Sequence, residues 1–475
     1  MSDPIFEAAL AAEALGVIAG VAPAYLDGLD ARPVRDHSTA PLLDALAGPL
    51  PEKGHGSISA LEELARVGTV AATHSSGPRF FHFVTGGSTP AAQGADWLTS
   101  LLDQAGGLET ASQLATRTET VVLDWLKDLF ALPESFGGVL TPSATFANLT
   151  GLACARMWWA SEHGVDVVAD GLAGLPRMPV FSSGYVHASS RKAMQLLGLG
   201  RDRVVTLSGD DRGSLDLAAL EDALRKSGPA VIIANAGEVN AGDFDPIEAM
   251  AELAERHGSW LHVDGAFGLF AALSPRTSGL LAGVERADSV ASDGHKWLNV
   301  PYESGFAFVK NPEMLKLAFG SWGAAAAYLT MGDPDRLDYN RLGPESSRRA
   351  RAFPIWATLR AYGREGHRAM VERHLDLARR LGDGVEASPE LELMAPVRLN
   401  IVCFRATPAG VADLDDFNRR LGRAILEDGR VYLGTSIYRG AVVLRPAIVN
   451  WRTTGADIDL ILDVIAELTA RLLAE

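Results

Sequence analysis

Between about Gly86 and Asn311 the sequence alternates short apolar runs with longer amphipathic segments, and this alternation constrains the fold more than any other feature. The longer segments have helical spacing, as in Pro246–His257. Short β-rich runs that alternate with helices are typical of a mostly parallel sheet covered on both faces. We therefore predict an α/β fold with a sheet of seven strands, at Gly138–Leu140, Met178–Ser182, Val204–Thr206, Ala230–Ala234, Trp260–Val263, Ser289–Ala291 and Gly305–Val309.

The regions before and after this core have different patterns. A chain of 475 residues is too long for one compact core. We predict an N-terminal helical segment (1–85), a large domain (86–360) with an irregular, functional loop at about 320–351, and a small C-terminal α+β domain (361–475). The elements expected in the last part are a helix at Arg364–Leu381, strands at Leu399–Phe404, Tyr432–Thr435 and Ala441–Arg445, and a final helix at Ala456–Leu473.

The charge balance restricts the partners. There are 43 Lys and Arg against 59 Asp and Glu, a formal net charge of -16, whereas a protein that tracks phosphates has a basic face. We expect neither nucleic acid nor a membrane as a partner. Cys154 and Cys403 lie in apolar runs and form no CxxC motif, so we predict buried thiols and no metal site. Acidic residues interrupt the N-terminal stretch, so we expect no signal peptide or membrane helix and a cytoplasmic protein.

Two polar elements follow apolar runs in the first half of the predicted sheet. Ser143-Ala144-Thr145 opens a helical pattern, where free backbone N–H groups and the helix dipole form a natural phosphate seat. A simple helix cap is the alternative. His187 follows the second run among small residues, and it could stack on an aromatic cofactor, transfer a proton or make a structural hydrogen bond.

An aspartate and a lysine follow later runs. A buried strand-end carboxylate such as Asp264 costs free energy unless it meets a cation or several donors. A protonated pyridine nitrogen is such a cation, and the pair makes the ring a stronger electron acceptor. A metal is the alternative, with His262 as only one further ligand. Lys296 lies between two apolar runs, where burial lowers the pKa of an amine and favours imine formation, unless it is a surface or ion-paired lysine.

The four elements together resemble the group II decarboxylases, which depend on pyridoxal 5′-phosphate (PLP) and include aromatic amino acid and glutamate decarboxylases. The resemblance extends from about Pro78 to Gly366. It implies the aspartate-aminotransferase fold (PLP fold type I) and an obligate homodimer with sites at the subunit boundary. Its motifs are Pro78-Arg-Phe-Phe81, Asp124-Trp-Leu126, His262-Val-Asp264, His295-Lys296-Trp297 and Arg348-Arg349.

The resemblance also implies roles for individual residues. Lys296 would hold PLP as a Schiff base and Asp264 would pair with the pyridinium nitrogen. His187 and Ala266 would cover the two faces of the ring. The phosphate would be held by Ser143, Ala144, Thr145 and His295. Substrate contacts are expected from Phe81, Phe83, Val239 and Arg348, and the catalytic residues from Lys296, His187 and a loop tyrosine, Tyr328, with Tyr339 as its rival.

Decarboxylation of an L-amino acid to an amine and CO₂ is the predicted reaction. Family members commonly have a Gly-Thr-Thr turn where this chain has Gly237-Glu238-Val239, so the familiar aromatic and glutamate substrates are in doubt. The alternatives are a decarboxylation-dependent aldehyde synthase, an aminotransferase or carbon–carbon lyase in which Arg348 and Arg351 bind a second carboxylate, and a non-catalytic PLP-binding protein.

Overall fold

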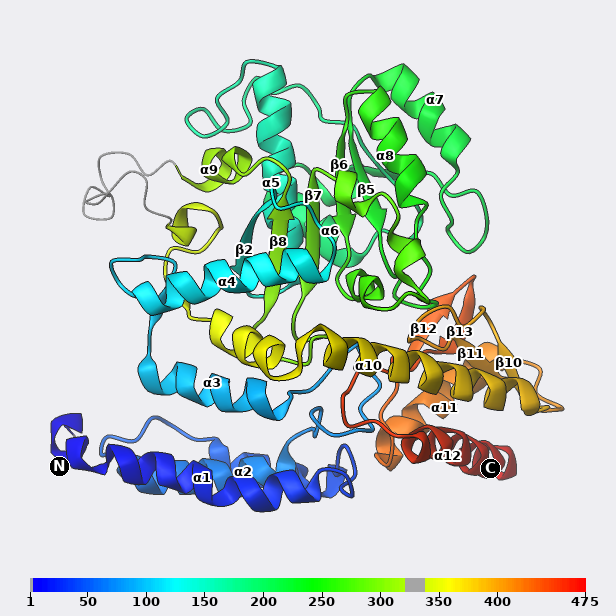
Figure 1. Cartoon of the computed structure of the whole chain (residues 1–475). Coiled ribbons are helices and arrows are strands. Elements are labelled where there is room, and N and C mark those ends of the chain that lie inside the picture. Colours follow the sequence, from blue (N-terminus) through cyan, green and yellow to red (C-terminus); the bar gives the residue numbers. More distant parts are fainter. Residues whose placement is uncertain (1–2, 321–337) are drawn as a thin grey trace.

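A seven-stranded sheet forms the centre of the computed structural model, which describes residues 3–320 and 338–475 (Figure 1). The strand order is β2-β8-β7-β6-β5-β3-β4. In this seven-stranded sheet β8 runs opposite to the other six strands, which are parallel to one another. All seven predicted strands are therefore confirmed, at β2 (Gly137–Thr141), β3 (Val180–Ser182), β4 (Val204–Thr206), β5 (Val231–Asn235), β6 (Trp260–Asp264), β7 (Ser289–Asp293) and β8 (Gly305–Val309).

Helices cover the sheet, which explains why its strands are continuously apolar. All five residues of β5 are buried, as expected for a strand covered on both faces. Helix α5 (Ala144–Glu162) packs against β7 and β8, and α8 (Ile247–Arg256) packs against β5 and β6 (Figure 1). The remaining helices of this part are α4 (Gln113–Leu129), α6 (Ala188–Leu196), α7 (Leu217–Ser227) and α9 (Glu313–Phe319), and a short ribbon joins β1 (Ala105–Gly106) to β9 (Arg348–Arg349).

Three parallel strands end side by side and present polar residues at one edge. In the register of the sheet, Asp264 at the end of β6 is paired with Asn235 of β5 and with Ala291 of β7. Strand β7 continues two residues further, to Asp293. Carboxyl ends of parallel strands are the usual location of ligand sites in open α/β sheets.

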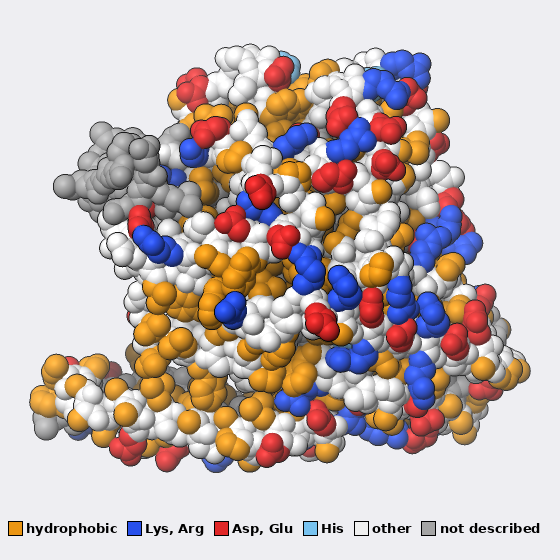
Figure 2. All heavy atoms as spheres, in the orientation of Figure 1, with side chains coloured by type: hydrophobic (Ala, Val, Ile, Leu, Met, Phe, Trp, Pro, Cys, Tyr) orange, Lys and Arg blue, Asp and Glu red, His pale blue; other side chains and the backbone are white. Residues whose placement is uncertain are grey.

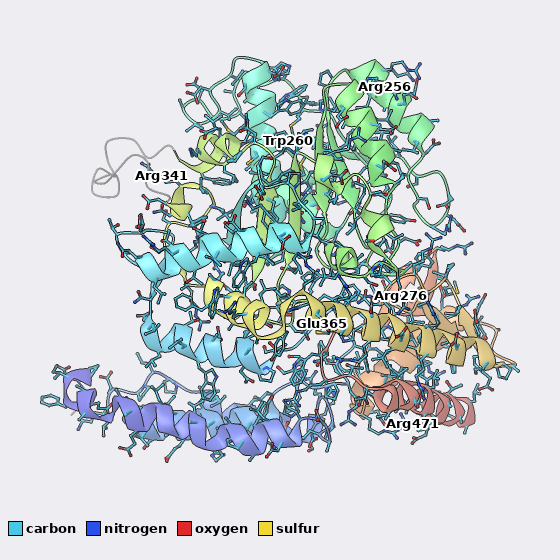
Figure 3. All side chains as sticks on the ribbon, in the orientation of Figure 1. Arg256, Trp260, Arg276, Arg341, Glu365 and Arg471 are labelled. Carbon is cyan, nitrogen blue, oxygen red and sulfur yellow. The ribbon has the colours of Figure 1, made fainter. Side chains whose placement is uncertain are left out.

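The C-terminal part has a smaller core of its own. Helix α10 (Ala352–Ala387), interrupted at Gly363, leads into a four-stranded antiparallel sheet that packs with α11 (Leu414–Asp428) and α12 (Gly455–Ala474). Arg276, which is labelled in Figure 3, forms an ion pair with Asp376 of α10 (2.8 Å). This pair connects the large domain to the helix. The predicted last helix begins with a capping box formed by Thr454 and Asp457. The strands are β10 (Leu391–Leu393), β11 (Phe404–Ala406), β12 (Thr435–Tyr438) and β13 (Ala441–Leu444).

Two strands of this domain begin later than predicted. The apolar residues at 399–403 and 432–434 are mostly buried but lie outside the named strands, where single bridges connect Ile401 to Ala447 and Tyr432 to Phe80. Burial by neighbouring segments gives connecting backbone the same apolar pattern as a strand, so the pattern misplaced the boundaries. The predicted limit at residue 360 falls inside α10, and the three domain limits stay a prediction.

The N-terminal segment forms a helical hairpin along one edge of the molecule. Helices α1 (Ala11–Gly28) and α2 (Ser57–Ala71) lie side by side below α3 (Pro90–Leu102) in Figure 1, and no residue of α1 is buried. Figure 2 shows hydrophobic side chains over α3 and along the hairpin. Large apolar side chains that are exposed here include Ile5, Phe6, Leu15, Leu64, Trp97 and Leu101.

Within the described residues, one helical stretch, Pro4–Gly28, is long and apolar enough to cross a membrane by length and composition alone. The expectation of no signal peptide or membrane helix stays a prediction, because this stretch is identified by length and composition only. Its acidic residues are too few and too widely spaced to interrupt an 18-residue apolar window. Length and composition do not distinguish a membrane helix from a signal sequence or from a helix covered by another protein surface.

Candidate active site

A cavity of about 220 Å³ opens at the carboxyl ends of the parallel strands. Six of the predicted site residues line it: His187, Asp264, Ala266, Lys296, Phe83 and Val239. They come from segments far apart in the sequence, and only the fold brings them together. The other lining residues are Val84, Tyr185, Asn235, Gly237, Phe267 and Arg445.

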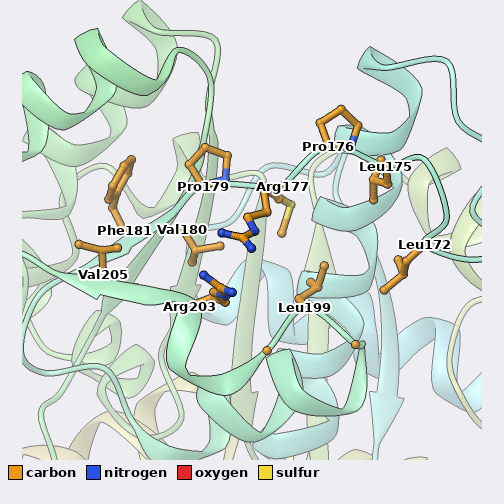
Figure 4. Close-up of a pocket in the computed structure, with 13 residues that line it drawn as sticks. Leu172, Leu175, Pro176, Arg177, Pro179, Val180, Phe181, Leu199, Arg203 and Val205 are labelled. Carbon is orange, nitrogen blue, oxygen red and sulfur yellow. The ribbon is translucent and has the colours of Figure 1, made fainter.

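A larger cavity of about 580 Å³ lies elsewhere, beside β3 and β4 at the edge of the sheet. Figure 4 shows Arg177 and Arg203 pointing toward one another inside it, among mostly apolar walls. No predicted cofactor residue lines this cavity. Chemistry, and not volume, therefore identifies the cavity at Lys296 as the candidate active site.

Asp264 is held by donors from three directions. Its Oδ2 accepts hydrogen bonds from Asn148 Nδ2 (2.8 Å) and Ser190 Oγ (3.0 Å), and its Oδ1 accepts one from the backbone N–H of Ala266 (3.2 Å). The residue is only 5% exposed. These donors compensate for burial of the carboxylate and fix its direction. Such a group, lining the cavity, suits a cationic ring nitrogen.

The side chain that positions Asp264, Asn148, is absent from the sequence-based prediction. Its Oδ1 accepts a hydrogen bond from His262 Nε2 (2.9 Å), while His262 Nδ1 lies 2.8 Å from Ser289 Oγ. Burial lowers the pKa of His262 to about 4, so this imidazole is neutral at pH 7. The signal in the sequence was a polar asparagine among small and apolar residues, one helical turn after Ala144, in a helix that proves to be largely buried.

A metal was the alternative partner for Asp264 and His262. His262 uses both ring nitrogens within the protein. In the part of the chain that the structure describes, no group of three or more His, Cys, Asp and Glu is placed to hold a metal ion. Cys154 and Cys403 are free and buried, as expected.

His187 precedes helix α6 and forms part of the cavity wall. Its Nδ1 accepts a hydrogen bond from the backbone N–H of Ser189 (3.1 Å), which leaves the proton of the neutral ring on Nε2. Burial lowers the pKa of His187, and the charge of Lys296 acts in the same direction, while Asp264 opposes them. A flat, neutral ring in this position is compatible with the stacking role that the resemblance implies.

Lys296 lies in the turn after β7, and the structure adds a partner that was not expected. Its Nζ is 3.5 Å from Asp293 Oδ2 and 5.7 Å from the centre of the Phe267 ring. The turn is fixed by a close backbone approach, because a Cβ on Gly86 would lie only 1.8 Å from the carbonyl oxygen of Lys296. The Lys296 side chain is 17% exposed, so it is partly buried rather than fully buried as expected, and it is ion-paired with Asp293.

The residues predicted to hold the phosphate lie at the start of α5 and just after β7. Ser143 caps the helix without a side-chain hydrogen bond, and the backbone N–H of Ala144 is directed at Asp293 Oδ1 (2.6 Å). His295 lies on the other side of Asp293, with its Nδ1 at 3.4 Å from the same oxygen. Two of the four residues predicted to hold phosphate, Ala144 and His295, thus contact the Asp293 carboxylate.

Together these groups fit PLP. A donor-supported carboxylate for the ring nitrogen and a lysine for the carbonyl line one cavity. The helix N-terminus that suits the phosphate is connected to this lysine through Asp293, which contacts both Ala144 and Lys296. The negative charge of Asp293 next to Ala144 opposes a phosphate at this position.

Two predicted substrate contacts are wrong. Arg348 is buried away from the cavity and donates two hydrogen bonds of 2.8 Å to the carboxylate of Glu119. The Phe81 side chain is buried in the core of the C-terminal domain. Arg351 is paired with Glu345 and Glu303, so the two arginines proposed for an aminotransferase are both engaged. Sequence alone did not reveal the acidic partners.

The two candidate loop tyrosines have different outcomes. Tyr328 lies outside the described residues. Tyr339 is 3% exposed and donates a hydrogen bond to Thr120 Oγ1 (2.9 Å), and it does not line the cavity. Burial raises the pKa of Tyr339 far above its usual value, which is unfavourable for a proton donor.

Arg445 is a cavity residue that the sequence did not suggest as a ligand. It follows β13, it is 9% exposed, and its Nη1 is buried without a hydrogen-bond partner among the described residues. By contrast, the Glu238 carboxylate turns into its own loop, where it accepts hydrogen bonds from Asn240 Nδ2 and the Ala241 N–H, both at 2.7 Å. At this turn Val239, and not Glu238, faces the cavity.

Comparison with known proteins agrees with this geometry. Residues 45–407 match the family model described as the pyridoxal-dependent decarboxylase conserved domain. The chain is 28% identical over 439 residues to an aromatic-L-amino-acid decarboxylase of Bacillus atrophaeus, covering 90% of this chain and 89% of that protein. It is 30% identical over 397 residues to a phenylacetaldehyde synthase of Arabidopsis thaliana, covering 79% and 78%.

A solved structure described as Oryza sativa TDC with PLP and tryptamine is similar over 98% of both chains, with a TM-score of 0.88 and 25% identity. The expected fold, cofactor and enzyme class are therefore confirmed. PLP is the cofactor, and the chain belongs to the family of pyridoxal-dependent amino acid decarboxylases, which are carboxy-lyases.

Proposed function

We propose that this protein converts an L-amino acid into the corresponding amine and CO₂. The observation that carries the proposal is the convergence of Lys296, Asp264 and Arg445 on one cavity of about 220 Å³. When bound, PLP supplies an electron acceptor for the bond that breaks at Cα. Asp264 holds the positive charge at the end of the cavity that the ring nitrogen would occupy, and Lys296 supplies the amine that anchors the cofactor.

Arg445 is proposed to orient the amino acid by binding its carboxylate. It supplies a buried guanidinium whose Nη1 has no hydrogen-bond partner in the described part of the chain, in the cavity that Val239 and Phe83 also line. A guanidinium pairs well with a carboxylate, and the buried cavity strengthens that attraction. His187 lines the same cavity.

The substrate side chain is proposed to be moderately apolar. Phe83, Val84 and Val239 provide apolar surface in the cavity, whereas Glu238 turns its charge away from it. An aromatic or a branched aliphatic amino acid fits this environment. The Bacillus relative, named as an aromatic-L-amino-acid decarboxylase, supports the aromatic option.

A second candidate function is decarboxylation with oxidation to an aldehyde, which the Arabidopsis relative is named for. The resemblance gives Tyr328 the role of protonating the substrate carbon, and this retained tyrosine favours the amine. We expect Tyr328→Phe to release more aldehyde, ammonia and peroxide than the wild type, because phenylalanine packs alike but donates no proton.

The test is a panel of L-amino acids assayed in parallel for CO₂, amine, aldehyde and peroxide. One amine per CO₂ with an apolar substrate supports the proposal, and Lys296→Ala serves as the blank. Equal amounts of aldehyde and CO₂ would assign the second function. Transfer of the amino group to an added 2-oxo acid without CO₂ would overturn both.

We further propose that two copies of the chain form a cytoplasmic dimer. Large apolar side chains of the α1–α2 hairpin and of the outer side of α3, among them Leu15, Leu64, Trp97 and Leu101, are exposed in a single copy, and a symmetric partner would bury them. The free, buried cysteines are compatible with a reducing compartment.

A further inference from the structure

Asp293 places a carboxylate in the position where the cofactor phosphate is expected. It is 3% exposed at the end of β7, and its Oδ1 accepts the backbone N–H of Ala144 at 2.6 Å. Ala144 is the first residue of α5, a 19-residue helix whose positive dipole end stabilises an anion. A carboxylate of the protein itself therefore occupies the anion-binding position at the start of α5.

The charges around Asp293 come from several elements. Lys296 Nζ lies 3.5 Å from its Oδ2 and His295 Nδ1 lies 3.4 Å from its Oδ1, and both stabilise the ionised form. Burial and the negative charge of Asp264 act in the opposite direction and leave the pKa of Asp293 raised. His187 and Tyr302 are close enough for its charge to affect their own pKa values.

A phosphate and this carboxylate cannot both be ionised at one seat without strong repulsion, since two like charges at a shared site force one of them to accept a proton. The Asp293 side chain is only 4% exposed, and its strand is held in the sheet by neighbours on both sides, so it has little room to turn away. A protonated carboxyl, by contrast, donates a hydrogen bond to a phosphate oxygen.

We propose that Asp293 is a proton-linked cofactor-binding residue: it occupies the anion seat as a carboxylate in the free protein, and it takes up one proton from solvent when the phosphate of PLP binds. The proton adds to a carboxylate oxygen, and the resulting O–H donates to the phosphate. The same protonation removes the carboxylate partner of Lys296, so the amine that bonds to the cofactor is released as the phosphate arrives. This inference rests on the assignment of the phosphate to the start of α5.

The sign of the pH dependence follows from linkage. A carboxyl group whose pKa is higher in the complex than in the free protein makes binding tightest at low pH. Binding then weakens as pH rises above the free-state pKa, by up to about tenfold per pH unit. The phosphate group has its own ionisation near pH 6, but it contributes equally to the wild type and to a variant.

The experiment compares Asp293→Asn with the wild type by equilibrium dialysis of PLP between pH 6.5 and 9. The asparagine side chain has nearly the same shape as that of aspartate. It is neutral at every pH and can donate a hydrogen bond to a phosphate oxygen. We expect Asp293→Asn to bind PLP about tenfold more tightly at pH 8, with a flatter pH dependence. Pyridoxal, which lacks the phosphate, should show no such gain.

Asp288→Asn is the matched control. Asp288 is a mostly buried carboxylate just before the opposite end of β7, and it accepts the backbone N–H of Leu261 at 2.8 Å. It is remote from Ala144 in the sheet register, so the PLP affinity and its pH dependence should equal those of the wild type.

Calorimetry of PLP binding in buffers with different ionisation enthalpies counts the protons directly. The wild type should take up as much as one more proton per PLP than Asp293→Asn does, and the difference should vanish with pyridoxal. Equal proton counts for the two proteins would overturn the proposal, as would an equal gain in affinity for pyridoxal, which would place the effect at Lys296. If the variant does not fold, PLP and pyridoxal are compared on the wild type alone. These readouts use binding only, so they stand even if no CO₂ release is found.

Discussion

The cavity end of the large sheet and the N-terminal hairpin differ in how fully a single chain buries their side chains. At the cavity end, Asp264 and His262 are buried and hydrogen-bonded within one chain. In the hairpin, no residue of α1 is buried, and Leu15 and Leu64 are about half exposed. The first region can be formed by a single chain, whereas the second exposes the kind of apolar surface that proteins normally cover.

This difference predicts separable effects of mutation. Changes in the cavity should abolish or weaken chemistry while leaving assembly intact. Changes on the hairpin should weaken assembly while the buried network of the cavity stays folded. Five variants, one of them a double substitution, test this separation, in order of decreasing effect.

Lys296→Ala should remove essentially all turnover, because among the described residues no other amine lines the cavity to anchor the cofactor. The protein should lose the visible absorbance that borohydride bleaches, yet sediment like the wild type. Lys192→Ala, at an exposed position of α6, is the control and should retain both colour and activity. A coloured, active Lys296→Ala would contradict the assignment of the site.

Asp264→Asn should reduce turnover by about 10- to 1000-fold. A carboxylate next to a cation shifts the pKa of that cation by one to three units, or roughly 1.4–4 kcal/mol, and that support is lost with the amide. The measurement is kcat at saturating PLP, with sedimentation as the check on assembly. A rate within twofold of the wild type would rule out this role.

Arg445→Met should raise KM by about 10- to 100-fold, since a hydrogen bond to a charged group contributes about 1.5–3 kcal/mol. Arg398→Met is the control, because Arg398 pairs with Asp243 (3.1 Å) and does not line the cavity. An unchanged KM for Arg445→Met would show that the substrate carboxylate binds elsewhere.

Leu15→Asp combined with Leu64→Asp should weaken the dimer by about tenfold or more, because each charge would have to be buried at the covered surface. Sedimentation over a range of concentrations measures the change, and Glu63→Gln on the exposed side of α2 is the control. A wild type that is a fully active monomer at micromolar concentration would refute the dimer itself.

Tyr339→Phe should have the smallest effect. Its hydroxyl only donates to Thr120, so its loss should cost about 1 kcal/mol of stability. The ratio of amine to aldehyde should not change, in contrast to Tyr328→Phe. A shift in product caused by Tyr339→Phe would mean that the two tyrosines are assigned the wrong way round.

The sequence predicted the large sheet well because its strands are buried on both faces. Short, continuous apolar runs such as those of β5 and β8, with helical segments between them, are typical of strands covered on both sides. In the C-terminal domain the same reasoning misplaced β11 and β12, because buried connecting backbone is as apolar as a strand.

For the site, the sequence identified residues with distinctive chemistry, such as Lys296 and Asp264. It did not predict which arginine reaches the cavity. Arg348 meets a buried glutamate, whereas Nη1 of Arg445 meets no acceptor among the described residues, and both facts depend on packing between distant segments. The pairing of Asp293 with the start of α5 was equally invisible, since the two lie 149 positions apart in the chain.

Helix α5 connects the two ends of the cofactor site, because it contributes one residue to each end, four positions apart. Ala144 marks the phosphate end and Asn148, which orients Asp264, marks the ring end. Four residues of α-helix rise by about 6 Å, and each residue turns the helix by about 100°. A single residue inserted between these two positions would rotate one end away from the other, although every side chain would still be present. The length of this turn should therefore be fixed in evolution more strictly than the identity of the residues within it.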